Sequence, residues 1–153
     1  MMHMKISAKA RYGLRILLDI ALNETPDRPR LMKDICEAQG LSEKFTSRLV
    51  IPLRENGMIH SQRGKLGGFR LAKAPGDISL LDIIEALQGP ISVIDCLDDD
   101  TACARTRKCA ARQIWGDVNA AIKNALQGIT LESVIAKIAT SKAIPSALAE
   151  YVI

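Results

Sequence analysis

Residues 31–42, with the sequence LMKDICEAQGLS, contain the strongest fold signal in the chain. Apolar side chains recur at helical spacing up to Gln39, and Gly40 then supplies the left-handed backbone that favours the end of a helix. Ser42 is a good N-cap for the next helix. A helix, a tight glycine turn and a second helix together predict a helix-turn-helix, whose second helix enters the major groove of DNA.

The segments on either side complete a winged domain. Ser7 and the periodic apolar residues after it predict a helix near residues 7–23, and the helix after Ser42 is expected to reach Gly57, bent or loosened by Pro52. Residues 58–63 and 69–72 suit two strands, joined by a glycine-rich basic loop at residues 64–68. The loop lacks the Gly-Lys-Ser/Thr ending of a phosphate-binding loop, which disfavours a nucleotide-binding enzyme and favours a wing.

A second region follows Pro75-Gly76. Helices are predicted at residues 80–87, 110–127 and 130–138. The longest has an apolar stripe, which favours a dimer interface, although the stripe can also pack on its own domain. Its residues are Ile114, Val118, Ile122 and Leu126. The predicted fold is mainly α with a two-stranded β wing: a winged helix-turn-helix at residues 4–75, a cysteine loop and dimerisation helix at 76–140, and a partly mobile tail at 141–153.

The 153 residues are expected to form one domain or a small domain with an appendage. No apolar run is long enough to span a bilayer and no signal-peptide pattern is found, so we expect a cytoplasmic protein without a membrane partner. The net charge of +4 is uneven. Residues 1–76 have an excess of +7 and residues 77–153 a net charge of −3, so the first half is expected to bind a polyanion.

Residues 96–109, CLDDDTACARTRKC, place three thiols in one polar loop. We call this stretch the cysteine segment. Its thiols, Cys96, Cys103 and Cys109, can converge on an iron–sulfur cluster or a soft metal, because such centres prefer thiolate ligands. Nearby cations such as Arg105 and Arg107 favour the thiolate form. Unrelated thiols or disulfides are the alternative, and the spacing by itself favours neither. Cys36 is interpreted as a small buried hydrophobe.

Outward side chains of the second helix, together with cations nearby, are the candidates for DNA contact. We expect early outward residues of that helix to face base edges, Glu43 to accept from cytosine N4, and Arg48 to reach guanine or phosphate. The wing suits the minor groove or its phosphates, and the first helix suits phosphates. The candidates are Glu43, Lys44, Thr46, Ser47, Arg48, Arg63, Lys65 and Arg11, with Arg15 beside it.

With the wing and cysteines in view, the chain resembles the IscR, NsrR and RirA family of iron–sulfur winged-helix repressors. The resemblance covers nearly the whole chain and rests on residues 4–15, 63–71, the three cysteines and residues 129–134. It implies a homodimer on double-stranded operator DNA. It also implies a [2Fe–2S] or [4Fe–4S] cluster held by Cys96, Cys103 and Cys109, in a regulator that senses iron, cluster supply, oxygen or nitric oxide.

The chain departs from this family at the fourth ligand. Arg112 stands where IscR-like members have histidine, and Arg11 stands where NsrR-like members have an acidic residue. One of the three aspartates at 98–100, a small thiol or water can fill the fourth position. An open iron site makes a cluster labile, as in RirA-like members.

Two other hypotheses use the same cysteines. In the first, oxidation of the thiols makes a cluster-free redox switch. In the second, Cys103 or Cys109 is the nucleophile of an enzyme. A nucleophile needs a positioned base, and His60 on the wing is the only histidine beyond residue 4, so we expect no enzyme.

Overall fold

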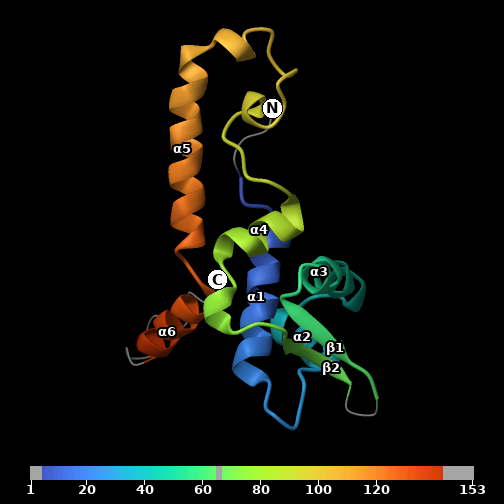
Figure 1. The fold of residues 1–153 in the computed structure, drawn as a ribbon. Coiled ribbons are helices and arrows are strands. Elements are labelled where there is room, and N and C mark those ends of the chain that lie inside the picture. Colours follow the sequence, from blue (N-terminus) through green and yellow to red (C-terminus); the bar gives the residue numbers. More distant parts are fainter. Residues whose placement is uncertain (1–4, 65–66, 143–153) are drawn as a thin grey trace.

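One face of the first helix, α1 (Ala8–Asn23), forms the centre of the core. The computed structural model describes residues 5–64 and 67–142. Ser7 caps α1 as predicted, since its hydroxyl accepts from the amide of Ala10. Ile16, Leu17 and Ile20 are fully buried. α1 contacts α2 (Met32–Gln39), α3 (Glu43–Glu55), α4 (Leu80–Gln88), α6 (Leu131–Lys142) and the wing, so this helix positions the other elements (Figure 1).

The predicted helix-turn-helix is present. It consists of α2 (Met32–Gln39) and α3 (Glu43–Glu55), with Gly40 between them at a φ of 62°. The Ser42 hydroxyl accepts from the Phe45 amide at the start of α3. Pro52 does not end α3, because the amide of Asn56 still donates to the Pro52 carbonyl at 3.0 Å. The mainly helical, winged fold class is therefore confirmed.

The wing is a two-stranded antiparallel sheet. Strands β1 (Ile59–Gln62) and β2 (Gly68–Leu71) pair from Ile59 opposite Leu71 to Gln62 opposite Gly68. Arg30 forms an isolated antiparallel β-bridge with β2, because its backbone exchanges two hydrogen bonds with Phe69, at 2.9 and 2.8 Å. A Cβ at Gly68 would lie 2.6 Å from the Arg30 carbonyl oxygen, so this bridge requires glycine.

The second region joins the same core. A short 3-10 turn, η1 (Pro75–Asp77), precedes α4 (Leu80–Gln88), where Ser79 and Asp82 form a capping box. The long helix α5 (Ala110–Gln127) stands beside α4, and α6 (Leu131–Lys142) returns to η1 and α1 (Figure 1). Leu131 is buried in the common core. In the described part of the chain, no helix is long and apolar enough to cross a membrane.

The structure corrects two predictions, the end of the last helix and the irregular conformation of the cysteine segment. The last helix was predicted to end at residue 138, but α6 reaches Lys142, so the start of the expected mobile tail is helical. Residues 143–153 lie outside the described residues, as does Lys65 in the wing loop.

The cysteine segment is not irregular throughout, because two 3-10 turns interrupt the connection between α4 and α5. They are η2 (Asp95–Leu97) and η3 (Thr106–Lys108).

A buried ion pair ties α1 to the loop before α2. The guanidinium of Arg30 donates twice to the Asp19 carboxylate, at 3.0 and 3.1 Å. The Asp19 side chain is 7% exposed and that of Arg30 is 20% exposed. Asn23 also donates to Asp19 at 3.1 Å. A carboxylate this buried needs its cation, because water cannot replace the missing charge.

We expect Arg30→Ala to lower the free energy of unfolding by about 3 kcal/mol, because the charge of Asp19 is then buried without its partner. Urea denaturation followed by circular dichroism measures the loss. Lys33→Ala is the control: it removes an exposed pair with Glu37 and should cost less than about 0.5 kcal/mol. Equal losses in the two variants would contradict the structural role of the Asp19–Arg30 pair.

Candidate nucleic-acid interface and cysteine segment

The outer face of α3 presents three of the predicted DNA contacts to solvent. Glu43, Lys44 and Arg48 are exposed and Ser47 is half-buried. Leu49, Val50 and Leu53 are buried on the opposite face. The helix therefore has the one-sided polarity of an element that packs on a core and faces a partner.

Thr46 was expected to face outward with these residues, and that prediction is wrong. Its side chain is fully buried, its hydroxyl donates to the Ser42 carbonyl at 3.0 Å, and the Cys36 thiol lies 3.3 Å from it. Thr46 precedes Leu49, Val50 and Leu53 by three, four and seven positions, which is the spacing of one helix face. This periodicity was the signal available in the sequence. Cys36, interpreted from the sequence as a small buried hydrophobe, is half-buried and contacts α3 through this hydrogen bond.

An aromatic contact fixes α3 against α1. The rings of Tyr12 and Phe45 meet edge to face, with centroids 5.8 Å apart. The Arg15 guanidinium lies 5.2 Å from the Tyr12 centroid, and its Nε donates to Gln39 of α2 at 2.9 Å. Arg15 therefore joins α1 to the helix-turn-helix, whereas Arg11 is exposed.

The wing carries an exposed cation, Arg63. Arg63 follows β1 and is exposed. Arg70, on the paired strand, donates to the carbonyls of Thr25 and Pro26 and to the Gln62 side chain, so it fixes the hairpin to the loop after α1. The exposed cations of α3 and the wing belong to the half of the chain that has the positive net charge.

The cysteine segment lies at the end of α5 that is far from the wing (Figure 1). Cys96, in η2, is half-buried, whereas Cys103 and Cys109 are exposed, and all three are free thiols. Thr106 is the buried residue of the segment, and its hydroxyl donates to the Cys103 carbonyl at 2.7 Å. Arg105, Arg107 and Lys108 around it are exposed.

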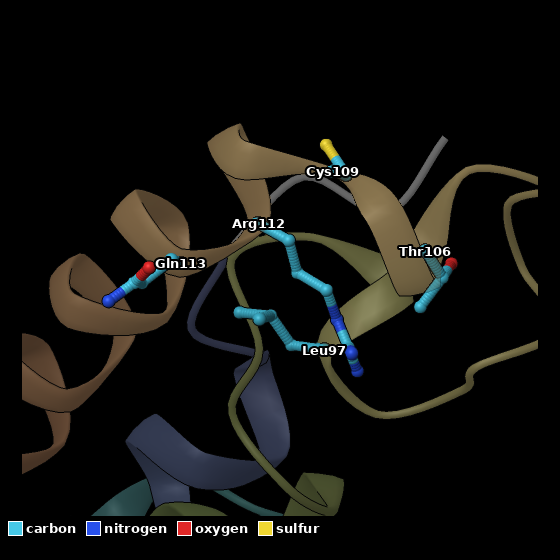
Figure 2. Close-up of a pocket in the computed structure, with 5 residues that line it drawn as sticks. All are labelled: Leu97, Thr106, Cys109, Arg112 and Gln113. Carbon is cyan, nitrogen blue, oxygen red and sulfur yellow. The ribbon is translucent and has the colours of Figure 1, made fainter.

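Arg112, in the first turn of α5, spans the segment. Its Nε donates to the Cys96 carbonyl at 2.9 Å and its Nη2 donates to the Asp100 carboxylate at 2.6 Å. We call this pair of contacts the Arg112 bridge. Beside it lies an open depression of about 350 Å³, lined by Leu97, Thr106, Cys109, Arg112 and Gln113. Figure 2 shows the Cys109 sulfur pointing away from the Arg112 side chain.

Two of the three aspartates proposed as fourth ligands have partners already. The hydroxyl and the amide of Thr101 donate to Asp99, at 2.6 and 2.8 Å, and these bonds lower the pKa of the Asp99 carboxyl below its ordinary value. Asp100 accepts from Arg112. Asp98 is exposed.

The donor set suits an iron–sulfur cluster in its chemistry but not in its placement. Iron–sulfur clusters are held by cysteine thiolates, and the segment supplies three of the usual four. Within residues 5–64 and 67–142, however, no three His, Cys, Asp or Glu side chains lie together closely enough to hold a metal ion. The expected convergence of Cys96, Cys103 and Cys109 is therefore not present in this conformation.

Comparison with known families and proteins identifies what the chain resembles. The profile of the Rrf2 family, described as iron-dependent transcriptional regulators, matches residues 6–137. The transcriptional regulator CymR of Bacillus subtilis is 39% identical over 84% of this chain and 88% of its own length. Protein rrf2 of Nitratidesulfovibrio vulgaris is 37% identical over 84% and 85%. The regulator IscR of Klebsiella pneumoniae is 33% identical over 86% and 80%.

Solved structures include the same two kinds of relative. CymR, the global cysteine regulator of B. subtilis, has a TM-score of 0.70 at 36% identity, covering 87% of this chain and 97% of its own. IscR of T. potens has a TM-score of 0.69 at 31% identity, covering 96% of both chains. An oxidized form of Staphylococcus aureus CymR has a TM-score of 0.64 at 33% identity, over 86% and 95%.

We predict that Arg63→Ala weakens binding to a DNA duplex and lowers the slope of log K against log salt by about 1 per protomer, because one phosphate contact releases one counterion fewer. Fluorescence anisotropy over a salt series measures the slope. Lys137→Ala, on α6 and away from α3 and the wing, removes the same charge as a control. An unchanged slope with full affinity for Arg63→Ala would exclude the contact.

Proposed function

This chain belongs to the Rrf2 family of transcriptional regulators, and we propose that it binds operator DNA as a homodimer whose affinity is set by the state of the cysteine segment. DNA-binding regulation of transcription follows from the family, which is not a family of enzymes. The expectation that no enzyme would use Cys103 or Cys109 as nucleophile is thereby confirmed. The mode of sensing, the contact residues and the dimer belong to the proposal.

The proposed DNA contacts are the exposed candidates of α3, α1 and the wing. They are Glu43, Lys44, Ser47, Arg48, Arg63 and Arg11; Lys65, in the undescribed part of the wing loop, remains a sequence-based candidate. α3 would enter the major groove and Arg63 would reach the backbone or the minor groove. Residues 4–75 would form the DNA-binding unit and residues 76–140 the sensing and dimerisation unit. Because Leu131 of α6 is buried in the same core as α1, the two units share one core and differ in their proposed function.

The exposed apolar surface of α5 supports the dimer. None of the eighteen residues of α5 is buried. Ile114, Trp115 and Val118 are 64%, 45% and 39% exposed, whereas Ile122 and Leu126 pack partly against the core. The predicted stripe thus divides into an inner part that packs on its own chain and an outer part that does not. Such an apolar surface on a long helix favours a second copy, which would also present two α3 helices to two half-sites.

For the sensing mode, we propose an iron–sulfur cluster held by Cys96, Cys103 and Cys109. The observation that carries this proposal is the presence of three free thiols in the one segment between α4 and α5. The similarity to IscR of K. pneumoniae and T. potens supports it. Because the thiols are not gathered in the present conformation, the segment must rearrange to take up a cluster.

A cluster-free thiol switch is the second candidate, and one observation favours it. Two of the thiols, Cys103 and Cys109, are exposed and can be oxidised without the convergence that a cluster requires. The similarity to CymR of S. aureus, for which an oxidized form has been solved, supports this candidate.

We expect Val118→Asp to convert the dimer into a monomer, because each interface would then bury an unpaired carboxylate against apolar side chains. Sedimentation velocity measures the mass, and binding to a duplex with two half-sites should weaken with it. Asn124→Asp adds the same charge at another exposed position of α5 and should leave the mass unchanged. A dimeric Val118→Asp protein would move the interface away from this face.

Purification without oxygen separates the two sensing modes. Under the cluster proposal the protein is coloured and contains iron and acid-labile sulfide, and Cys103→Ser loses most of both, since one ligand is gone. Cys36→Ser, which leaves the cysteine segment intact, should retain them. A colourless protein whose DNA affinity falls or rises on mild oxidation, and recovers on reduction, would support the thiol switch. A DNA affinity that changes neither on oxidation nor in Cys103→Ser would contradict both sensing modes.

A further inference from the structure

The Arg112 bridge connects the cysteine segment across its whole length. Its acceptors, the Cys96 carbonyl and the Asp100 carboxylate, lie 16 and 12 positions before Arg112 in the sequence. Cys109 is adjacent to α5 and lies at the other end of the same segment. One guanidinium therefore fixes the half-buried Cys96 turn to the start of α5, while Cys103 and Cys109 remain exposed.

We propose that Arg112 is the positioning residue of the cysteine segment: the Arg112 bridge holds Cys96 in place and keeps the three thiols from gathering, so that a signal acts by releasing it. This inference rests on the proposed role of the segment in sensing. Arginine suits the task because its planar fork makes two directed hydrogen bonds at once, here to a carbonyl and a carboxylate. The residue that departs from the IscR-like pattern thus has a defined partner set.

The bridge is built to be reversible. The side chain of Asp100 is 66% exposed and that of Arg112 is 30% exposed, so water screens the ion pair and solvates both groups when it breaks. The Arg30–Asp19 pair differs, since its carboxylate is almost completely buried and its release would leave a charge without solvent. Of these two arginines, Arg112 is therefore the one whose ion pair can open without unfolding the core.

An order of thiol access follows from the bridge. Cys103 and Cys109 are open to solvent while the bridge is intact, whereas Cys96 lies in the turn whose carbonyl Arg112 binds. Release of Arg112 frees both the Cys96 turn and the Asp100 side chain. A ligand or modification that requires Cys96 consequently competes with the bridge, and a conformational equilibrium of this kind shifts only by the difference in affinity between its two states.

The test measures alkylation of each cysteine in the full-length, reduced protein freed of metal by a chelator. Iodoacetamide is uncharged, and mass spectrometry gives the rate at each position. We expect Arg112→Ala to raise the rate at Cys96 several-fold and to leave the rate at Cys103, already exposed, nearly unchanged. Arg112→Lys, which can replace one hydrogen bond but not the fork, should give an intermediate rate at Cys96.

Arg107→Ala is the charge-matched control. Arg107 is exposed in the same segment, and among the described residues it takes part in no salt bridge. Arg107→Ala removes a positive charge from the same segment but leaves the Arg112 bridge intact, so the alkylation rate at Cys96 should not rise. A Cys96 rate that is unchanged or slower in folded Arg112→Ala would overturn the proposal.

Asp100→Asn gives a second, independent outcome. It removes the ion pair at an exposed position, so folding is retained, and it should raise the Cys96 rate by less than Arg112→Ala does. Unchanged Cys96 rates in Asp100→Asn and Arg112→Lys would also count against the bridge if Arg112→Ala fails to fold. Since no DNA or cluster is present, this result is separate from the proposed sensing function, whose own failure shows as DNA affinity indifferent to the cysteines.

Discussion

Burial of one face of α1 is the constraint on which the other elements depend. Ile16, Leu17 and Ile20 are completely buried, and α1 contacts α2, α3, α4, α6 and the wing. The helix-turn-helix is thus placed by a hydrophobic contact to its rear, which leaves its polar face free. The Tyr12–Phe45 contact extends this arrangement to the start of α3, where the exposed residues begin.

The helix α5 has the opposite character. It has no buried residue, it presents apolar side chains to solvent at its first half, and it begins at the last cysteine of the cysteine segment. A change in that segment therefore acts directly on the helix proposed to join two copies. Because a rigid helix transmits rotation along its length, such a change can alter the relation between two DNA-binding units without altering either core. Coupling between sensor and DNA requires a difference in affinity between the two arrangements.

Three side chains have roles that residue type alone does not reveal. Thr46 is polar but buried, because its hydroxyl bonds within its own helix and so tolerates the core. Arg30, which no sequence pattern singled out, neutralises a buried carboxylate eleven positions away. Arg112 stands where a metal ligand was sought and instead binds a carbonyl and a carboxylate. In each case the role of the side chain depends on the atoms that it contacts, which the residue type does not specify.

Local rules in the sequence determined the helices, their caps at Ser7, Ser42 and Ser79, the glycine turn at Gly40 and the two strands, since each depends on neighbours within a few positions. The same rules grouped the three cysteines and, with the resemblance, predicted a DNA-binding regulator. Only the tertiary structure decided that the thiols are apart, that Arg30 pairs with Asp19 and with the edge of β2, and that α5 is half covered. Those features depend on contacts between residues distant in sequence, whose distances are fixed by packing rather than by spacing along the chain.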